Sequence, residues 1–126
     1  MNRTVAGIVF VHFVATVFHG IAHARAQVPL SYAASVFVFT VILAGPLLGL
    51  VLMWLSKRIG AAVIAVTMAG AFVFGFVNHF VLTSPDHISH IAERWRPLFT
   101  ATAVLLASTE GLGSVLAVQA LRGGRS

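Results

Sequence analysis

Four long apolar segments, separated by short polar links, constrain this chain more than any other feature of its sequence. A helix that crosses a bilayer needs about 20 largely apolar residues, because each residue adds about 1.5 Å to its length. Four stretches meet this requirement, at about residues 4–24, 30–55, 59–82 and 97–121. The sequence therefore predicts an all-α membrane protein of four transmembrane helices, which form a single domain over residues 1–126.

The composition supports this prediction, because 59% of the 126 residues are hydrophobic and only 9% are charged. A soluble domain has about a quarter of its residues charged, so this chain has too little polar surface to face water on all sides. The absence of cysteine excludes disulfides, thiolate metal ligands and cysteine nucleophiles. The basic residues are few and scattered, so we expect the lipid bilayer and no nucleic acid as a partner.

The links between the predicted spans indicate how the chain is threaded. Short links join neighbours that run in opposite directions, so we expect an up-down bundle with both termini on one side. We count five basic residues on that side against three on the other: Arg3, Lys57, Arg58, Arg122 and Arg125, against Arg25, Arg94 and Arg96. Under the positive-inside rule, both termini are predicted to be cytoplasmic, in a bacterial-type inner (plasma) membrane. The first apolar stretch is longer than that of a signal peptide, so we expect it to be retained.

The longest link, between the third and fourth spans, has a pattern of its own. Ser84, Pro85 and Asp86 suit the start of a helix. Apolar residues then recur at spacings of three and four, at Ile88, Ile91, Ala92 and Trp95. This pattern predicts a short interfacial helix over about 85–95, with one apolar face in the membrane surface.

Histidine is unusually frequent for so apolar a chain, with six residues. An ionisable side chain inside a membrane is costly and commonly marks function. His12, His19 and His23 fall on one stripe of the first span, and His19 and His23 are one turn apart, a spacing that lets two imidazoles bind one metal ion. Helix rise places His79 of the third span at the same depth, near the outer leaflet. We predict a metal site of His19, His23 and His79.

His87 and His90, one turn apart on the expected interfacial helix, are the candidates to complete this site. Imidazole ligands suit copper, iron or zinc. The alternative is haem b, held axially by His79 and one histidine of the first span, although the pairing of His19 with His23 favours direct ligation. A further alternative is that these histidines are only polar residues at a membrane boundary, bonded to backbone carbonyls or reaching toward the interface.

Glu110 and His12 lie at similar depths near the middle of the membrane, on the fourth and first spans. A hydrogen-bonded pair would relieve the cost of burying them and would fix the packing of the two helices. The functional alternative is a proton relay or a second metal position. Asn78 and Asp86 are candidates for hydrogen-bond partners of a metal-bound imidazole.

The patterns His19-x-x-x-His23 and His87-x-x-His90 resemble the histidine boxes of membrane di-iron oxygenases and desaturases. The resemblance covers these motifs alone, and the chain has no adjacent His-His pair. The four-helix b-type cytochromes are similar in architecture only. We assign the chain to no family on these grounds.

The function expected from these residues is that of a small metal-binding membrane protein, a redox or metal-handling component. Two alternatives remain: a non-catalytic accessory subunit of a larger membrane complex or homo-oligomer, and a small permease whose polar path contains His12 and Glu110. Motifs for serine hydrolysis, phosphate binding and HExxH zinc proteases are absent from the sequence.

Overall fold

A computed structural model describes residues 2–123; Met1 and residues 124–126, among them Arg125 of the charge count above, lie outside the described residues. Within residues 2–123 the secondary structure is helical, with no strand. Four helical stretches are long and apolar enough to cross a membrane, which agrees with the four predicted segments to within about two residues at each end: Arg3–Ala26, Tyr32–Leu55, Lys57–Val81 and Arg96–Gly123.

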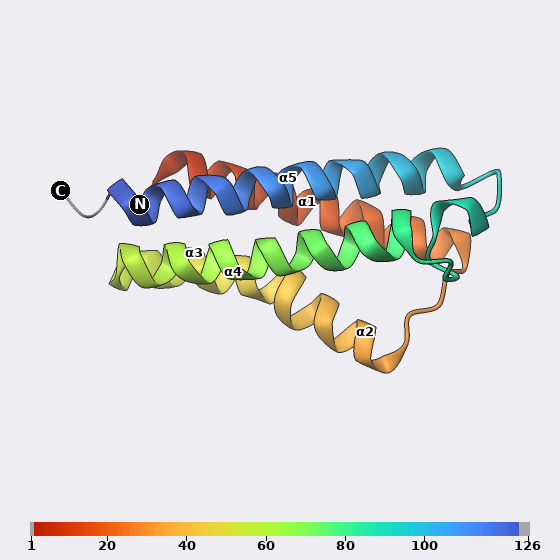
Figure 1. The fold of residues 1–126 in the computed structure, drawn as a ribbon, viewed down its shortest axis with the longest axis horizontal. Helices are drawn as coiled ribbons and strands as arrows, with labels where there is room; N and C mark the ends of the chain where they lie inside the picture. Colours follow the sequence, from red (N-terminus) through yellow and green to blue (C-terminus); the bar gives the residue numbers. More distant parts are fainter. Residues whose placement is uncertain (1, 124–126) are drawn as a thin grey trace.

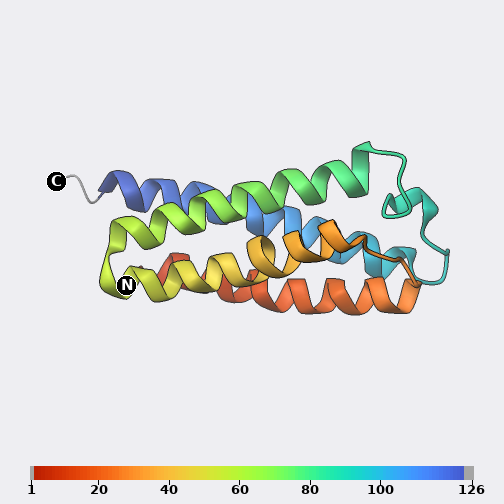
Figure 2. The same ribbon diagram turned by 90° about the horizontal axis from the view of Figure 1, so that it is seen from below.

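The elements that make up these stretches follow one another along the chain. They are α1 (Arg3–Ala26), α2 (Tyr32–Phe37), the π-helical η1 (Val38–Ala44), α3 (Gly45–Leu55), α4 (Lys57–Phe76), the π-helical η2 (Val77–Val81) and α5 (Arg96–Gly123). Each long stretch runs back along the molecule relative to the one before it (Figure 1, Figure 2). The start of α1 and the end of α5 consequently lie at the same end of the molecule, together with the turn between α3 and α4.

Polar residues cap the helices at the end of the molecule that contains the start of α1. Asn2 caps α1, its side chain accepting a hydrogen bond from the backbone N–H of Thr4 at 3.0 Å. The single residue Ser56 joins α3 to α4, and its side chain accepts from the N–H of Ile59 at 3.4 Å. Within the described residues, Lys and Arg also lie at the helix ends and links rather than in the middle of the helices. Between these ends the long stretches are largely apolar.

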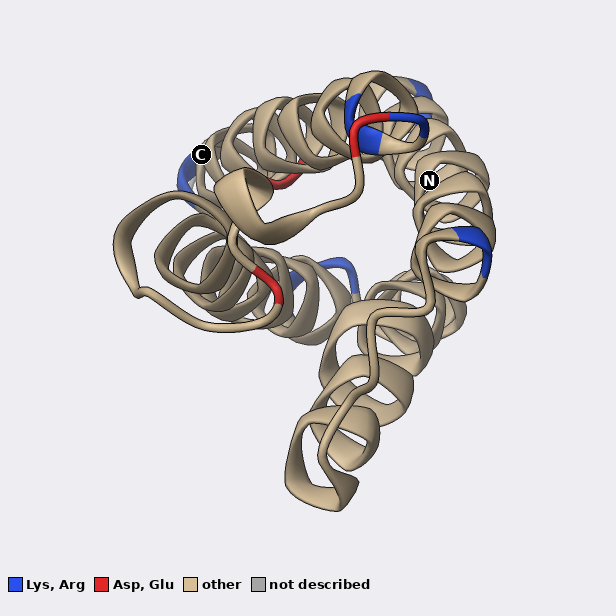
Figure 3. Cartoon of the chain, turned by 90° about the vertical axis from the view of Figure 1, so that its right-hand side faces the viewer, with Lys and Arg blue, Asp and Glu red and all other residues tan. Residues whose placement is uncertain are grey.

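The second span bends in its middle. Its π-helical segment η1 ends at Ala44, directly before Gly45-Pro46. Proline lacks an N–H for the carbonyl four residues back and its ring crowds that carbonyl, so the turn before it widens. The helix is kinked near Pro46, and α2 diverges from the other helices (Figure 1, Figure 3). One end of the molecule is thereby opened.

Small residues close the opposite end. A Cβ atom added to Gly60 would lie 2.5 Å from the carbonyl oxygen of Gly49 and closer still to Met53. Such glycines allow helix backbones to approach closely where lipid supplies no hydrophobic driving force. Around them lies an apolar core drawn from all four long stretches: Val5, Val9, Met53, Ile64, Ala65, Met68 and Ala117.

The link between the third and fourth spans differs from its prediction. In place of a helix over 85–95, the structure has a 3₁₀ turn, Ile88–His90, between irregular turns. Ile91, only 2% exposed, packs against Ala22 and Phe99 at the end of the bundle. The side chain of Asp86 is also turned inward and buried. The apolar residues that indicated an amphipathic helix instead cover the end of the bundle, which a straight interfacial helix would leave open.

Candidate metal centre

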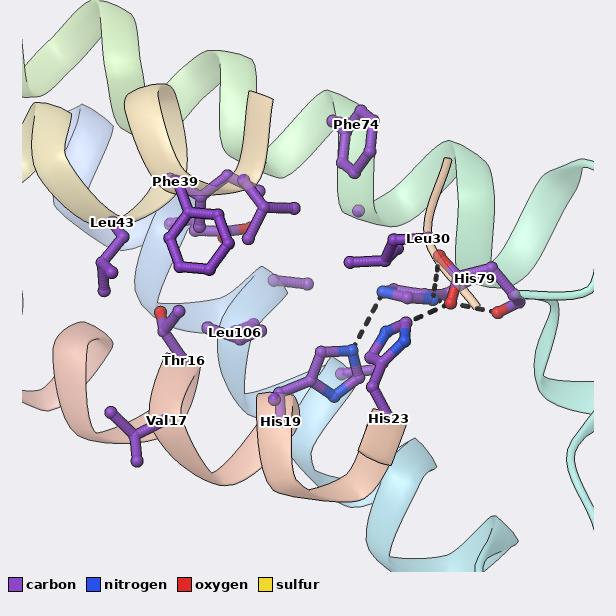
Figure 4. Close-up of a pocket in the computed structure, with 18 residues that line it drawn as sticks. Thr16, Val17, His19, His23, Leu30, Phe39, Leu43, Phe74, His79 and Leu106 are labelled. Carbon is purple, nitrogen blue, oxygen red and sulfur yellow. Dashed lines mark hydrogen bonds and ion pairs between the residues drawn. The ribbon is translucent and has the colours of Figure 1, made fainter. Parts of the chain in front are cut away.

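Three histidines from two spans meet near the open end of the molecule. His19 and His23 come from successive turns of α1, and His79 comes from η2. Each offers a ring nitrogen, and the three nitrogens all lie within 4.8 Å of one another (Figure 4). We call His19, His23 and His79 the histidine cluster. The shared depth inferred from helix rise thus corresponds to real proximity in the fold.

Thr102 of α5 orients the imidazole of His19. Its hydroxyl donates to the carbonyl of Leu98 at 2.8 Å, which is the usual bond of a threonine within a helix. The hydroxyl oxygen is then an acceptor toward Nδ1 of His19, which lies 2.8 Å away. We therefore assign the proton of His19 to Nδ1, and this leaves a lone pair on Nε2.

Asp86 orients His79 in the same way. Its backbone carbonyl, which can only accept, lies 3.0 Å from Nδ1 of His79, and its carboxylate oxygen Oδ2 lies 3.4 Å from the same nitrogen. Nδ1 of His79 is thus the donor, and Nε2 of His79 also carries a lone pair. A carboxylate or carbonyl behind a histidine is the arrangement that fixes the tautomer of metal-binding imidazoles.

The two bare nitrogens face each other. Nε2 of His19 and Nε2 of His79 are 3.1 Å apart, with both rings buried. With both Nδ1 atoms protonated, two lone pairs at this distance repel, and a proton or a metal ion between them would make the contact favourable. Two nitrogens bound to one tetrahedral ion at about 2.0–2.1 Å would lie about 3.3 Å apart. The observed separation is close to that value.

His23 completes the triangle. Its Nε2 lies 3.1 Å from Oδ1 of Asp86, as an ion-pair contact. Within residues 2–123, neither Nδ1 of His23 nor Oδ1 of Asp86 has an aligned hydrogen-bond partner, although both atoms are buried. Buried polar atoms without partners are rare and call for an explanation such as a bound ion. A ring nitrogen of His23 also lies within 4.8 Å of ring nitrogens of His19 and His79.

Phe99 forms a wall common to the three imidazoles. Its ring centre lies 4.8, 4.9 and 5.2 Å from those of His19, His23 and His79. The side chain is fully buried and packs with Ala22 and Ile91. A rigid apolar ring in this place excludes water and limits the orientations that the imidazoles can adopt. The cluster is therefore held in place from three helices and one link.

His12 and Glu110 form a second buried pair, farther into the molecule. Nε2 of His12 lies 3.3 Å from Oε1 of Glu110, with side-chain exposures of 2% and 3%. The two side chains are brought together as their depths indicated, but they do not join the histidine cluster. The other oxygen of Glu110 faces Gly75, where an added Cβ would lie 3.9 Å both from that oxygen and from the ring of His79.

Three other residues singled out in the sequence lie outside the cluster. His87 and His90 belong to the 3₁₀ turn region: Nδ1 of His87 accepts from the N–H of Ser89 at 3.1 Å, and Nδ1 of His90 donates to the carbonyl of Ser84 at 2.6 Å. They were expected to approach along an interfacial helix that the structure does not contain. Asn78 donates to the carbonyl of Phe74, one turn back on its own helix, at 2.8 Å.

Two residues of the site were missed in the sequence. Thr102 and Phe99 stand among ordinary apolar and helix-bonded residues of α5, and only their depth, close to that of His19, could have indicated them. Comparison of the chain with protein-family models, curated proteins and solved structures finds no match. The chemistry of the site must therefore be argued from its own geometry.

Proposed function

We propose that this protein binds one transition-metal ion through His19, His23 and His79 and acts as a redox or metal-handling component of a membrane. The observation that carries the proposal is the pair of facing Nε2 atoms, 3.1 Å apart, each left with a lone pair by the partner of its other ring nitrogen. A metal ion would turn this repulsive contact into two bonds. The ring of His23 lies close enough to be the third ligand.

The ligand set suggests the kind of ion. Three imidazoles suit copper, iron or zinc, and zinc sites with a purely structural role commonly contain thiolates, which this chain lacks. Asp86 would serve as the negatively charged partner of His23 and His79. Three protein ligands leave a further coordination position, which is typical of sites where a metal ion acts on another molecule.

The geometry favours a single ion over haem. In a haem site with two axial histidines, the porphyrin lies between the two imidazoles. His19 and His79 approach each other too closely at Nε2 for a macrocycle to lie between them. His23, on the same stripe of α1, contacts His19 ring edge to face at 4.8 Å and would also be in the way.

The setting that we propose is an up-down bundle in a bacterial-type inner membrane. All four long helices are apolar enough to span it, and four basic residues lie at the end away from the cluster: Arg3, Lys57, Arg58 and Arg122. With this end cytoplasmic, the histidine cluster would lie near the outer face. It would there be accessible to metal from outside the cell and to molecules dissolved in the outer leaflet.

The test is metal analysis of protein purified without chelators, combined with its absorption spectrum. We expect about one equivalent of copper, iron or zinc, retained through gel filtration, and no Soret band. A Soret band with stoichiometric iron would instead require haem.

A metal-free preparation that also fails to take up copper, iron or zinc would overturn the proposal. The facing imidazoles would then share a proton, with Asp86 as the negatively charged group beside them. This result would favour the alternative that the protein is an accessory subunit in which these polar residues serve only in helix packing.

A further inference from the structure

A cavity of about 390 Å³ begins at the histidine cluster and extends toward the middle of the molecule. This volume lies within the range of small-molecule binding sites. Its walls come from all four long stretches, and in Figure 4 the side chains of Phe39, Leu43, Phe74 and Leu106 surround it with the imidazoles at one end. The cavity is thus apolar along its length and polar where the proposed ion would lie.

The mouth of the cavity opens sideways, between the first and second spans. Among the residues that line it, Val17 of α1 is 46% exposed and Phe39 of η1 is 62% exposed. The opening exists because the bend before Pro46 carries α2 and η1 away from α1 (Figure 1). In a membrane this side faces lipid, so a molecule would enter from the bilayer and would not have to cross water.

Two polar groups face the cavity from different directions. The histidine cluster occupies one end, and Glu110, held by His12, contributes to the wall farther in. A saturated lipid chain offers nothing to either group. A neutral lipophile with an oxygen atom at one end matches both the apolar walls and the polar end.

From this arrangement we infer that the cavity binds a neutral, membrane-dissolved molecule with an apolar body and a hydroxyl or carbonyl oxygen, which it presents to the histidine cluster. The inference deepens the proposed function and rests on it, because the oxygen would take the remaining coordination position of the metal ion. The proposed ligand class is thus the class of molecule on which the bound metal ion would act. Charged and water-soluble substrates are excluded by the apolar mouth.

The experiment uses a matched pair of competitors, para-hexylphenol and hexylbenzene, which differ only in the hydroxyl group. The full-length protein in phosphatidylcholine vesicles, with its metal content measured first, is labelled by a phenol that carries a photoreactive diazirine on its alkyl chain. The labelled residues are mapped by mass spectrometry. We expect labels on cavity residues such as Leu43 and Leu106, and competition by the phenol that is about tenfold stronger than by hexylbenzene at equal membrane concentration.

Two glycines of α1 supply the variant and its control. Gly20 lines the cavity mouth and Gly7 does not, and a Cβ added at either meets nothing within 4 Å. Gly20→Leu should abolish labelling of the cavity residues while metal content is retained, and Gly7→Leu should change neither.

The outcomes separate the two proposals. Metal-loaded protein that is labelled only on its outer surface, or equally strong competition by both competitors, would overturn this inference and leave the metal site intact. Protein without metal would overturn the proposed function, together with the proposed coordination of the ligand's oxygen by the metal ion.

Discussion

The two ends of this molecule are formed by the same four apolar spans but are packed differently. At the end with Ser56, glycines and small residues bring α3 and α4 into backbone contact, and the core is apolar. At the other end, π-helical segments and a proline bend keep the helices apart, and buried polar groups fill part of the space. Close helix packing at one end can thus stabilise a small bundle whose helices diverge around buried polar groups at the other end.

The largest effect is expected from removing a ligand at the open end. His79→Ala should weaken metal binding by about 100-fold or more, because the remaining imidazoles then lack the partner that faces them. His90→Ala, which alters a histidine outside the cluster, should leave the metal affinity unchanged. The measurement is metal titration of purified protein, with helix content checked by circular dichroism.

His79→Gln guards against a folding artefact, since its amide fills similar space but is a poor ligand. If either His79 variant bound metal as tightly as the native chain, the assignment of the cluster would be wrong.

The closed end should respond in stability and not in metal binding. Gly60→Ala places a Cβ 2.5 Å from the carbonyl oxygen of Gly49. The resulting shift of two backbones should lower the free energy of unfolding by about 1–3 kcal/mol. Gly7→Ala, which meets open space, should stabilise the protein by about 0.5–1 kcal/mol.

Both glycine variants are compared by unfolding in mixed detergent micelles, with metal affinity measured on the folded fraction. A large loss of metal affinity in Gly60→Ala would show that packing at the closed end controls the metal site, contrary to this prediction.

A smaller effect is expected at the residue that holds two of the imidazoles. Asp86→Asn keeps the backbone carbonyl that orients His79 but removes the charge beside His23. We expect metal affinity to fall by about tenfold, as for other hydrogen-bond partners of metal ligands. Glu93→Gln, an exposed carboxylate in the same link, is the matched control and should have no effect. Equal losses of metal affinity in both variants would show that Asp86 acts only through the overall charge of the link and not through its contacts with the imidazoles.

The smallest effect should come from the buried pair in the middle of the molecule. Glu110→Gln keeps the shape and can still hydrogen-bond to His12, so metal affinity should change less than about twofold and stability by less than about 1 kcal/mol. Metal titration and unfolding measure both. A larger change in affinity would instead favour a direct role of Glu110 in the metal site.

The sequence predicted the parts of this fold that depend on length and periodicity. Apolar runs located the four spans, and helix rise placed His19, His23 and His79 at one level, as well as His12 opposite Glu110. These inferences succeed because a helix converts sequence spacing into distance at a constant rate.

The remainder depended on how the helices and the last link pack against one another. The pattern from Ile88 to Trp95 fits an amphipathic helix, but burial of Ile91 and of Asp86 against the bundle end outweighs it. Thr102 has the local bond expected of any helical threonine, and its second role exists only because α1 lies beside α5. The cavity likewise results from the divergence of two helices, and the spacing of residues along either helix does not reveal the angle between them.

The single-residue link at Ser56 has a consequence for how the protein reaches its membrane. With one residue between α3 and α4, and two glycines that lock their backbones together, these spans cannot be separated by the width of a bilayer. We expect them to insert as one hairpin, and in the proposed orientation Lys57 and Arg58 at its tip would remain on the cytoplasmic side. The closed end would thus be assembled during insertion, before the histidines of the first and third spans meet.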